Sequence, residues 1–128
     1  MIPPIFPTVN VPAVQALLKT GTGPLRFYAW GKAPDNVEKP YAVWRQVFGL
    51  PENYIGDRPD ADQFTTQIDV YAADVAGQRG EKARAIAEAI SSAIEGAAYV
   101  TSWIGESRDP ETKNYVFTFQ CDWWVPRA

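Results

Sequence analysis

Three closely spaced carboxylates, Asp57, Asp60 and Asp62, are the residues of this sequence that could bind a metal ion. Carboxylate oxygens are the ligands that hard cations such as Ca²⁺ prefer. The segment lacks the ligand spacing of an EF-hand loop and its terminal bidentate glutamate. A solvated or interfacial acidic segment is therefore the better prediction, and we expect neither a metal site nor a bound cofactor.

Cys121 is the other side chain whose type could do chemistry, as a nucleophile. The sequence contains no histidine, so neither a histidine general base nor a common zinc site can be built. Cys121 also alternates with Phe119 and Trp123 along a predicted strand, which places all three on one face. This setting predicts a core cysteine, and the chain is predicted not to be an enzyme.

Tyr115, Phe117 and Phe119 are spaced like the aromatic platform on which RNA-binding sheets stack bases. The basic residue and glycines that flank such a platform are missing, and the formal net charge of the chain is −3. Nucleic-acid affinity comes largely from clustered Lys and Arg. Core packing is the favoured interpretation of these aromatics. An RNA-binding antiparallel sheet protein of RRM-like type is the alternative, and an unrecognised small-molecule enzyme is a distant third.

The length and composition predict one domain spanning residues 1–128. A chain of this size can bury roughly two thirds of its extended surface without disulfides, and its single cysteine cannot form an internal one. The apolar runs are too short for a membrane span, and the first ten residues lack the pattern of a signal peptide. We expect a soluble protein with no membrane contact, made in a reducing cytoplasm.

A strand that leads directly into a long helix, residues 64–96, is the unit around which the chain is organised. The strand, residues 64–72, alternates apolar and polar side chains. Asp74 is the predicted N-cap of the helix and Gly96 its left-handed C-cap. The apolar stripe of the helix consists of Ala76, Ala83, Ile86, Ala87, Ile90 and Ile94. The residues predicted to share one core are Ile68, Val70, Ile86, Ile90, Phe117 and Phe119.

The remaining elements complete an α+β fold. Prolines predict an extended arm over residues 1–10, and a short helix follows over residues 11–19. The other predicted strands cover residues 25–30, 41–48, 98–104 and 114–125. On the second of these, Ala42, Trp44, Gln46 and Phe48 are predicted to share a face. We expect a largely antiparallel sheet of about five strands with two helices packed on one face.

Residues 49–63 are predicted to form a long acidic loop. Loops of this length inside a compact domain are uncommon and are often functional. Carboxylates gather here, and Tyr54 and Ile55 could supply apolar contacts. The predicted assembly surface therefore consists of Glu52, Tyr54, Ile55, Asp57, Asp60 and Asp62.

Residues 40–53, PYAVWRQVFGLPEN, followed by QIDVYA at residues 67–72 and an alanine-rich helix, resemble the tail terminator family of long-tailed bacteriophages. These proteins are also called tail completion or head-to-tail joining proteins. The resemblance covers residues 40–125 and rests on strand and turn residues, because no catalytic motif defines the family.

The resemblance implies a structural virion protein at the head-proximal end of the tail, made in the host bacterial cytoplasm. Six copies would form a ring on the last ring of tail tube protein, stop tube polymerisation and provide the joint to the head connector. Viral DNA would pass through the lumen without specific binding. Carboxylates of the predicted loop, at the lumen or against the neighbouring ring, would repel the phosphates.

Overall fold

The computed structural model describes residues 4–51, 61–73, 81–110 and 113–126. Three helices and five strands occur in these ranges, and they confirm the predicted α+β class. In chain order they are α1 (Ile5–Val9), α2 (Pro12–Leu18), β1 (Phe27–Ala29), β2 (Tyr41–Pro51), β3 (Ala61–Ala72), α3 (Glu81–Ile94), β4 (Tyr99–Arg108) and β5 (Tyr115–Pro126).

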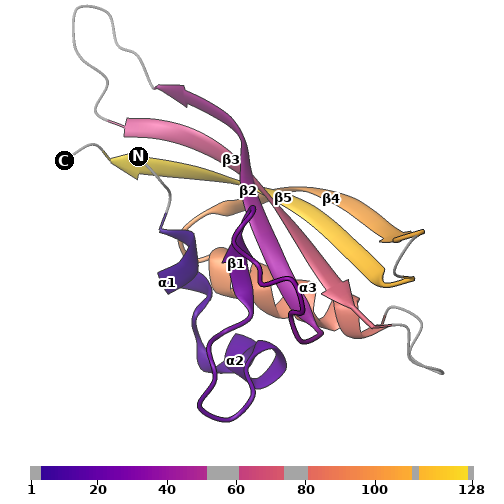
Figure 1. Cartoon of the computed structure of the whole chain (residues 1–128). Helices are drawn as coiled ribbons and strands as arrows, with labels where there is room; N and C mark the ends of the chain where they lie inside the picture. The colour runs from indigo at the N-terminus through magenta and orange to yellow at the C-terminus, as the bar shows by residue number, and fades with distance from the viewer. Residues whose placement is uncertain (1–3, 52–60, 74–80, 111–112, 127–128) are drawn as a thin grey trace, which may run out of the picture.

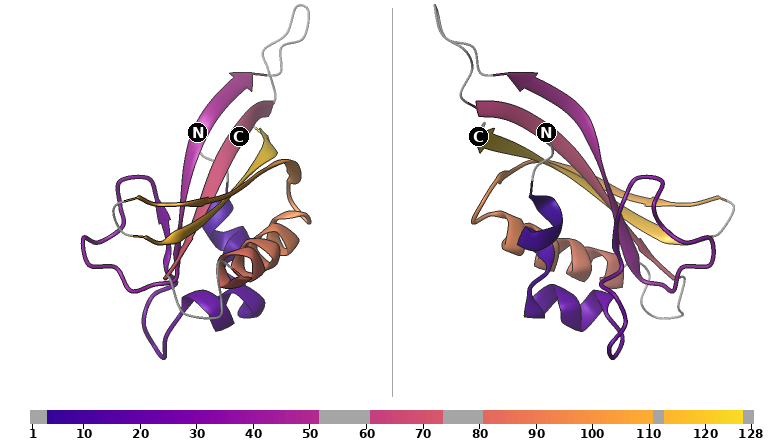
Figure 2. Two further views of the ribbon diagram at one scale, coloured as in Figure 1. Left: turned by 90° about the vertical axis from the view of Figure 1, so that its right-hand side faces the viewer. Right: turned by 60° about the vertical axis from the view of Figure 1, so that its left-hand side comes forward.

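The strands form one twisted sheet in the order β1-β2-β3-β5-β4 (Figure 1). Every neighbouring pair is antiparallel except β1 and β2, which run parallel. The three helices lie on the same side of the sheet in both views of Figure 2, and α3 contacts β3, β4 and β5. The strongly apolar β5 is an interior strand, as its sequence predicts.

The core lies between the sheet and the helices. Every second residue of β3 is buried, from Asp62 to Ala72, as expected for a strand with one covered face. Ile86 and Ile90 of α3 are fully buried against this face. Phe119 is also fully buried and Phe117 partly so, which confirms the predicted core. Burying each large apolar side chain stabilises the fold by roughly 1.5–3 kcal/mol.

A β-bulge in β2 moves Phe48 to the opposite face from the one predicted. The pairing of β2 with β3 shifts between Gln46 and Phe48. Phe48 therefore lies opposite Thr65, on the face of the sheet without helices, and is 50% exposed. The prediction that Phe48 shares a face with Ala42 was wrong, because one extra residue reverses the alternation.

The predicted extended arm was wrong, because residues 5–9 form α1. Pro7 is compatible with this helix since it lies in the first turn, where backbone N–H groups have no partner within the helix. Ile5 and Val9, one turn apart, are both buried in the main core. Three helices therefore cover the sheet face where two were predicted.

Two further boundary predictions differ from the structure. The predicted loop over residues 49–63 begins inside β2 and ends inside β3. At the end of α3, the N–H groups of Ala97 and Ala98 both donate to the carbonyl of Ile94, and Gly96 is not among the positive-φ glycines. Gly96 is therefore not a left-handed cap. The predicted N-cap, Asp74, and Ala76 lie outside the described residues.

Candidate assembly surface

The sheet face that points away from the helices is the open face. Alternate residues of a strand point to opposite faces of the sheet, so the pairing of the strands shows which residues lie on the open face. From β2, β3 and β5 they include Tyr41, Val43, Arg45, Phe48, Gln63, Thr65, Gln67, Asp69, Tyr71, Val116, Thr118, Gln120, Asp122 and Trp124.

The centre of the open face is a hydrogen-bonded polar ladder. The hydroxyl of Thr65 donates to Asp122 Oδ1 at 2.7 Å, and the hydroxyl of Thr118 donates to Asp69 Oδ1 at 2.7 Å. Each bond joins β3 to β5. The two carboxylates are thus held in place by neighbouring hydroxyls, and nothing in this arrangement activates a nucleophile. The ladder can present a fixed polar surface.

Stacked tyrosines border one end of the ladder. The rings of Tyr41 and Tyr71 lie 4.9 Å apart with an interplanar angle of 14°. Burial raises the pKa of both phenols, and the nearby carboxylates of Asp69 and Asp109 raise the pKa of Tyr71 further. Both rings therefore stay neutral and contribute an apolar border.

Exposed large hydrophobic side chains gather at the two opposite edges of the sheet. Trp30, Val47 and Phe48 form the β2-edge cluster, next to the short strand β1. The β4-edge cluster consists of Tyr99, Trp103, Ile104 and Trp124. Exposed apolar groups collected in this way mark protein–protein contact sites.

The rings of the β4-edge cluster are held by their neighbours. Tyr99 and Trp124 meet edge to face, with ring centroids 5.7 Å apart. Trp103 packs against Phe119 at 5.3 Å and against Phe117 at 5.9 Å, although 52% of Trp103 is exposed. These contacts restrict the rings of Tyr99, Trp103 and Trp124, which lowers the entropic cost of fixing them in an interface.

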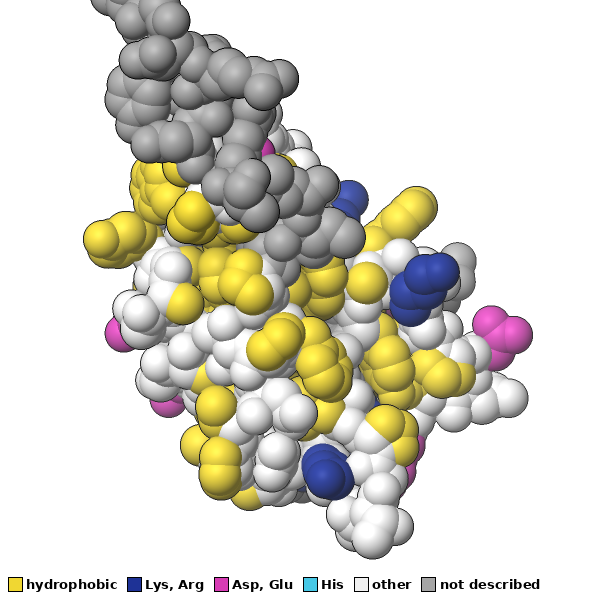
Figure 3. All heavy atoms as spheres, turned by 90° about the vertical axis from the view of Figure 1, so that its left-hand side faces the viewer, with side chains coloured by type: hydrophobic (Ala, Val, Ile, Leu, Met, Phe, Trp, Pro, Cys, Tyr) yellow, Lys and Arg dark blue, Asp and Glu magenta, His cyan; other side chains and the backbone are white. Residues whose placement is uncertain are grey.

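The side of the molecule that carries α1 is also largely apolar. Figure 3 views the side of α1, where hydrophobic side chains spread over the surface with few charged ones between them. Phe6 of α1 is 42% exposed, and Trp30, just after β1, is 71% exposed.

The backbone at the two edges is open to a neighbour only in part. β1 pairs with Ala42, Val43 and Trp44, so within the described residues the outer edge of β2 has no strand beside it from residue 45 onward. The outer edge of β4 likewise has none in the described ranges. Bulges interrupt both edge strands. Bulged edges resist uncontrolled strand pairing, so contact through side chains is favoured.

Of the predicted assembly residues, the structure places one. Glu52, Tyr54, Ile55, Asp57 and Asp60 lie outside the described residues, and their role stays a prediction.

Asp62 belongs to β3, opposite Val125 of β5, and is only 8% exposed. Placing Asp62 in a solvent-facing loop was wrong. The alternation that buries Phe64 extends back along the strand and turns Asp62 to the same face.

Cys121 is a core residue, as predicted. Its thiol lies 3.1 Å from the hydroxyl of Thr66, which accepts a hydrogen bond from the indole Nε1 of Trp123 at 3.0 Å. Burial raises the pKa of the Cys121 thiol. The protonated thiol is not a nucleophile.

The predicted RNA-binding platform points toward the helices. Phe119 is fully buried in the core, and Phe117 packs against the core. The RRM-like alternative therefore loses the feature that suggested it.

Metal sites and membrane spans are two other features that a sequence of this kind could carry. No three side chains among the Cys, Asp and Glu of these ranges come close enough to hold a metal ion. None of the described helices is long and apolar enough to cross a membrane.

The fold is that of a small α+β domain with exposed apolar side chains at two edges of its sheet. Residues 9–126, most of the sequence, match the family model of tail completion protein gp17. The chain belongs to this tail completion family, which indicates a structural role in a bacteriophage tail. A search of curated proteins finds no match to the sequence.

The two exposed edges were missed from sequence. The signal available was the high aromatic content, which suggested an interface without placing it. The sequence could not predict which aromatic residues lie at these edges. The bulges in β2 and β4 interrupt the alternation from which the face of each side chain is assigned.

Proposed function

We propose that this chain is the subunit of a ring that ends the phage tail tube. Six copies close on the last ring of tail tube protein, stop further polymerisation and present the surface to which the head connector binds. The ring is part of the virion, at the head-proximal end of the tail, and its subunits are made in the host bacterial cytoplasm.

The observation that carries this proposal is the pair of different apolar clusters on opposite sheet edges. A two-fold symmetric contact uses one patch twice and leaves the other patch in water. A heterologous contact sets the β2-edge cluster of one subunit against the β4-edge cluster of the next. Repetition of such a contact covers both clusters and closes a ring when the rotation fits. The number six follows from the symmetry of the tube that the resemblance implies.

The charge of the chain supports passage of viral DNA without specific binding. Asp and Glu number 15 against 12 Lys and Arg, which gives the net charge of −3. A ring built from subunits with a net negative charge repels the phosphates of DNA in its lumen and lets the duplex slide.

Acidic substitutions at each edge test the proposal. Ile104→Asp changes the β4-edge cluster, Val47→Asp changes the β2-edge cluster, and both side chains are more than 40% exposed. Ser92→Asp puts the same charge on the exposed surface of α3 and is the matched control. We expect both edge variants to fold but fail to cap purified tail tubes, whereas the control caps them. Normal capping by both edge variants, or a subunit count other than six at the tube end, would contradict the proposal.

Mixing the two edge variants separates a heterologous from a two-fold contact. Each variant keeps one intact cluster. With heterologous contacts, cross-linking at tube ends yields pairs that contain one subunit of each variant, and neither variant forms pairs alone. Pairs formed by a single variant would show a two-fold contact instead.

A further inference from the structure

A pocket of about 230 Å³ lies beside β1, and the proposed ring contacts do not use the residues that line it. Its walls come from the turn after α2, from β1 and the residue before it, and from the connection between β1 and β2. The lining residues that decide its chemistry are Thr20, Pro24, Arg26, Pro34, Val37 and Glu38.

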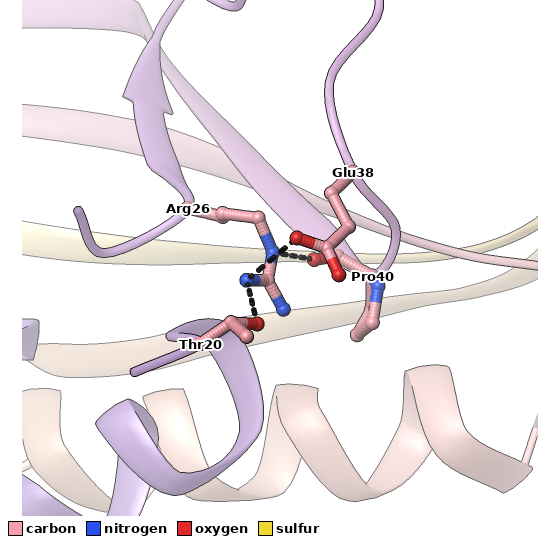
Figure 4. A network of polar contacts seen from close by, with 4 residues as sticks. All are labelled: Thr20, Arg26, Glu38 and Pro40. Carbon is pink, nitrogen blue, oxygen red and sulfur yellow. Dashed lines mark hydrogen bonds and ion pairs between the residues drawn. The ribbon is translucent and has the colours of Figure 1, made fainter. Parts of the chain in front are cut away.

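Arg26 supplies the charge of this pocket. Its side chain is only 9% exposed. The guanidinium Nε donates to the carbonyl of Pro40 at 2.8 Å, and Nη1 donates to the hydroxyl of Thr20 at 2.9 Å (Figure 4). Both partners are neutral, so these bonds orient the guanidinium without balancing its charge.

Glu38 balances that charge only weakly. Its Oε2 lies 3.7 Å from Arg26 Nη1, beyond hydrogen-bond distance, and its side chain is 66% exposed. A charged pair of this kind, with one partner in water, contributes little. Arg26 is therefore a largely buried cation without a hydrogen-bonded anion among the described residues.

One terminal nitrogen of Arg26 is available to a ligand. Nη2 makes no hydrogen bond to the described part of the chain, and Figure 4 shows it without a contact line. Since no fully buried side-chain nitrogen or oxygen of the described residues lacks a partner, Nη2 must be reached by solvent. Arg26 lines the pocket, and the N–H groups of Nη2 are its donors that remain for a ligand there.

The size and walls of the pocket define what enters. A volume of 230 Å³ is below the roughly 300–1,000 Å³ of sites for drug-sized ligands, so a small group matches it best. Pro24, Pro34 and Val37 give apolar walls. The N–H groups of Arg26 Nη2 can donate charge-assisted hydrogen bonds to a carboxylate oxygen, and Glu38 at the pocket would repel a doubly charged phosphate more strongly than a singly charged carboxylate.

We propose that this pocket binds a carboxylate that ends a short apolar chain, held by Arg26 and displacing Glu38 toward water. The carboxylate comes either from a small carboxylic acid free in solution or from a polypeptide, as an acidic side chain or a chain terminus. None of the residues that line the pocket belongs to either edge cluster, so the proposal does not rest on ring closure.

Propionate and its neutral isostere propionamide are the probes for the shared chemistry. Titrations of the full chain are followed by NMR at the Nε–H of Arg26 and the backbone N–H of Thr20. We expect saturable shifts with propionate and none with propionamide. Equal shifts with both compounds, or no shift with either, would overturn the proposal.

Charge variants provide the second measurement. Glu38→Gln removes the competing carboxylate and should tighten propionate binding about two- to fivefold, the equivalent of a partly exposed ion pair. Glu106→Gln is the matched control. It removes the β4 carboxylate that pairs with Arg84 of α3, at an exposed position, and should leave binding unchanged. Arg26→Lys keeps the charge but cannot bond Pro40, Thr20 and a ligand in the fixed geometry of a guanidinium, so it should weaken binding. If Arg26→Lys does not fold, Glu38→Gln still decides, because weaker binding by that variant contradicts the proposal.

A pair of peptides distinguishes the two sources of the carboxylate. Tripeptides that end in alanine are compared with a free and with an amidated C-terminus. Binding of the free form about tenfold tighter than propionate, a gain of about 1.4 kcal/mol, assigns the pocket to a polypeptide carboxylate. Binding no tighter than propionate assigns it to a small free acid.

Discussion

The two faces of the sheet use the same strands for different purposes. On the covered face, Ile68 of β3 and Phe119 of β5 are fully buried beneath the helices. On the open face, Thr65 and Asp122 of the same two strands are partly exposed and joined by a hydrogen bond. Apolar burial contributes most of the stability of a domain, whereas a partly exposed hydrogen bond replaces one to water and contributes little net. Substitutions should therefore separate the two faces by their effect on stability.

The largest effect is expected on the covered face. Ile90→Ala removes a fully buried side chain of α3 and should lower the free energy of unfolding by about 2–5 kcal/mol. Glu88→Ala, on the exposed surface of the same helix, is the control and should change it by less than about 0.5 kcal/mol. Denaturant unfolding measures both variants. A loss below about 1 kcal/mol for Ile90→Ala would mean that this helix face does not form the core.

Adjacent threonines on opposite faces give a direct comparison. Thr66→Val leaves the indole N–H of buried Trp123 without its acceptor and should cost about 1–3 kcal/mol. Thr65→Val removes two partly exposed bonds, the one that Thr65 donates to Asp122 and the one that it accepts from Gln63 Nε2 at 3.2 Å, and should cost less than about 1 kcal/mol. Thermal and denaturant unfolding of the two variants gives the difference. Equal losses would show that the polar ladder contributes as much as the buried network.

The next effect depends on pH. Burial raises the pKa of Cys121 in the folded state, so the folded thiol holds its proton at a pH where the unfolded thiol loses it. The contribution of the neutral Cys121 thiol to the free energy of unfolding is therefore complete below the ordinary thiol pKa. It falls as the pH rises above that pKa, by at most about 1.4 kcal/mol per pH unit. The window is roughly pH 8.5 to 10, below the ordinary tyrosine pKa.

Cys121→Ala should remove this contribution to the pH dependence. Stability measured across the window in both proteins tests it, and an identical slope would contradict the assignment. The thiol of the folded wild type should also resist disulfide reagents until the chain unfolds.

The smallest effect is expected where the covered face meets solvent. Arg84 of α3 and Glu106 of β4 form an ion pair in which both side chains are about half exposed. Solvent screens such a pair, so Glu106→Gln should leave the denaturation midpoint unchanged within error. A clear loss of stability that disappears at high salt would show that this pair helps to hold α3 on the sheet.

The sequence by itself determined the elements whose patterns are local. The alternation over residues 64–72 and the apolar stripe from Ala83 to Ile94 each place side chains on one face without reference to the rest of the chain. The same alternation identified β5 as an interior strand and Cys121 as a core residue. These predictions held because a period of two or 3.6 residues follows from backbone geometry alone.

Tertiary structure decided the features that depend on distant partners. Ile5 and Val9 fold as a helix because both can be buried in the core, although prolines predict an extended arm. The bulge beside Phe48 exists only in the pairing of β2 with β3, and it turns that ring to the open face. The pocket at Arg26 requires residues from before and after β1 to meet. Each of these depends on contacts between separate segments, and a local sequence pattern carries no information about which segments meet.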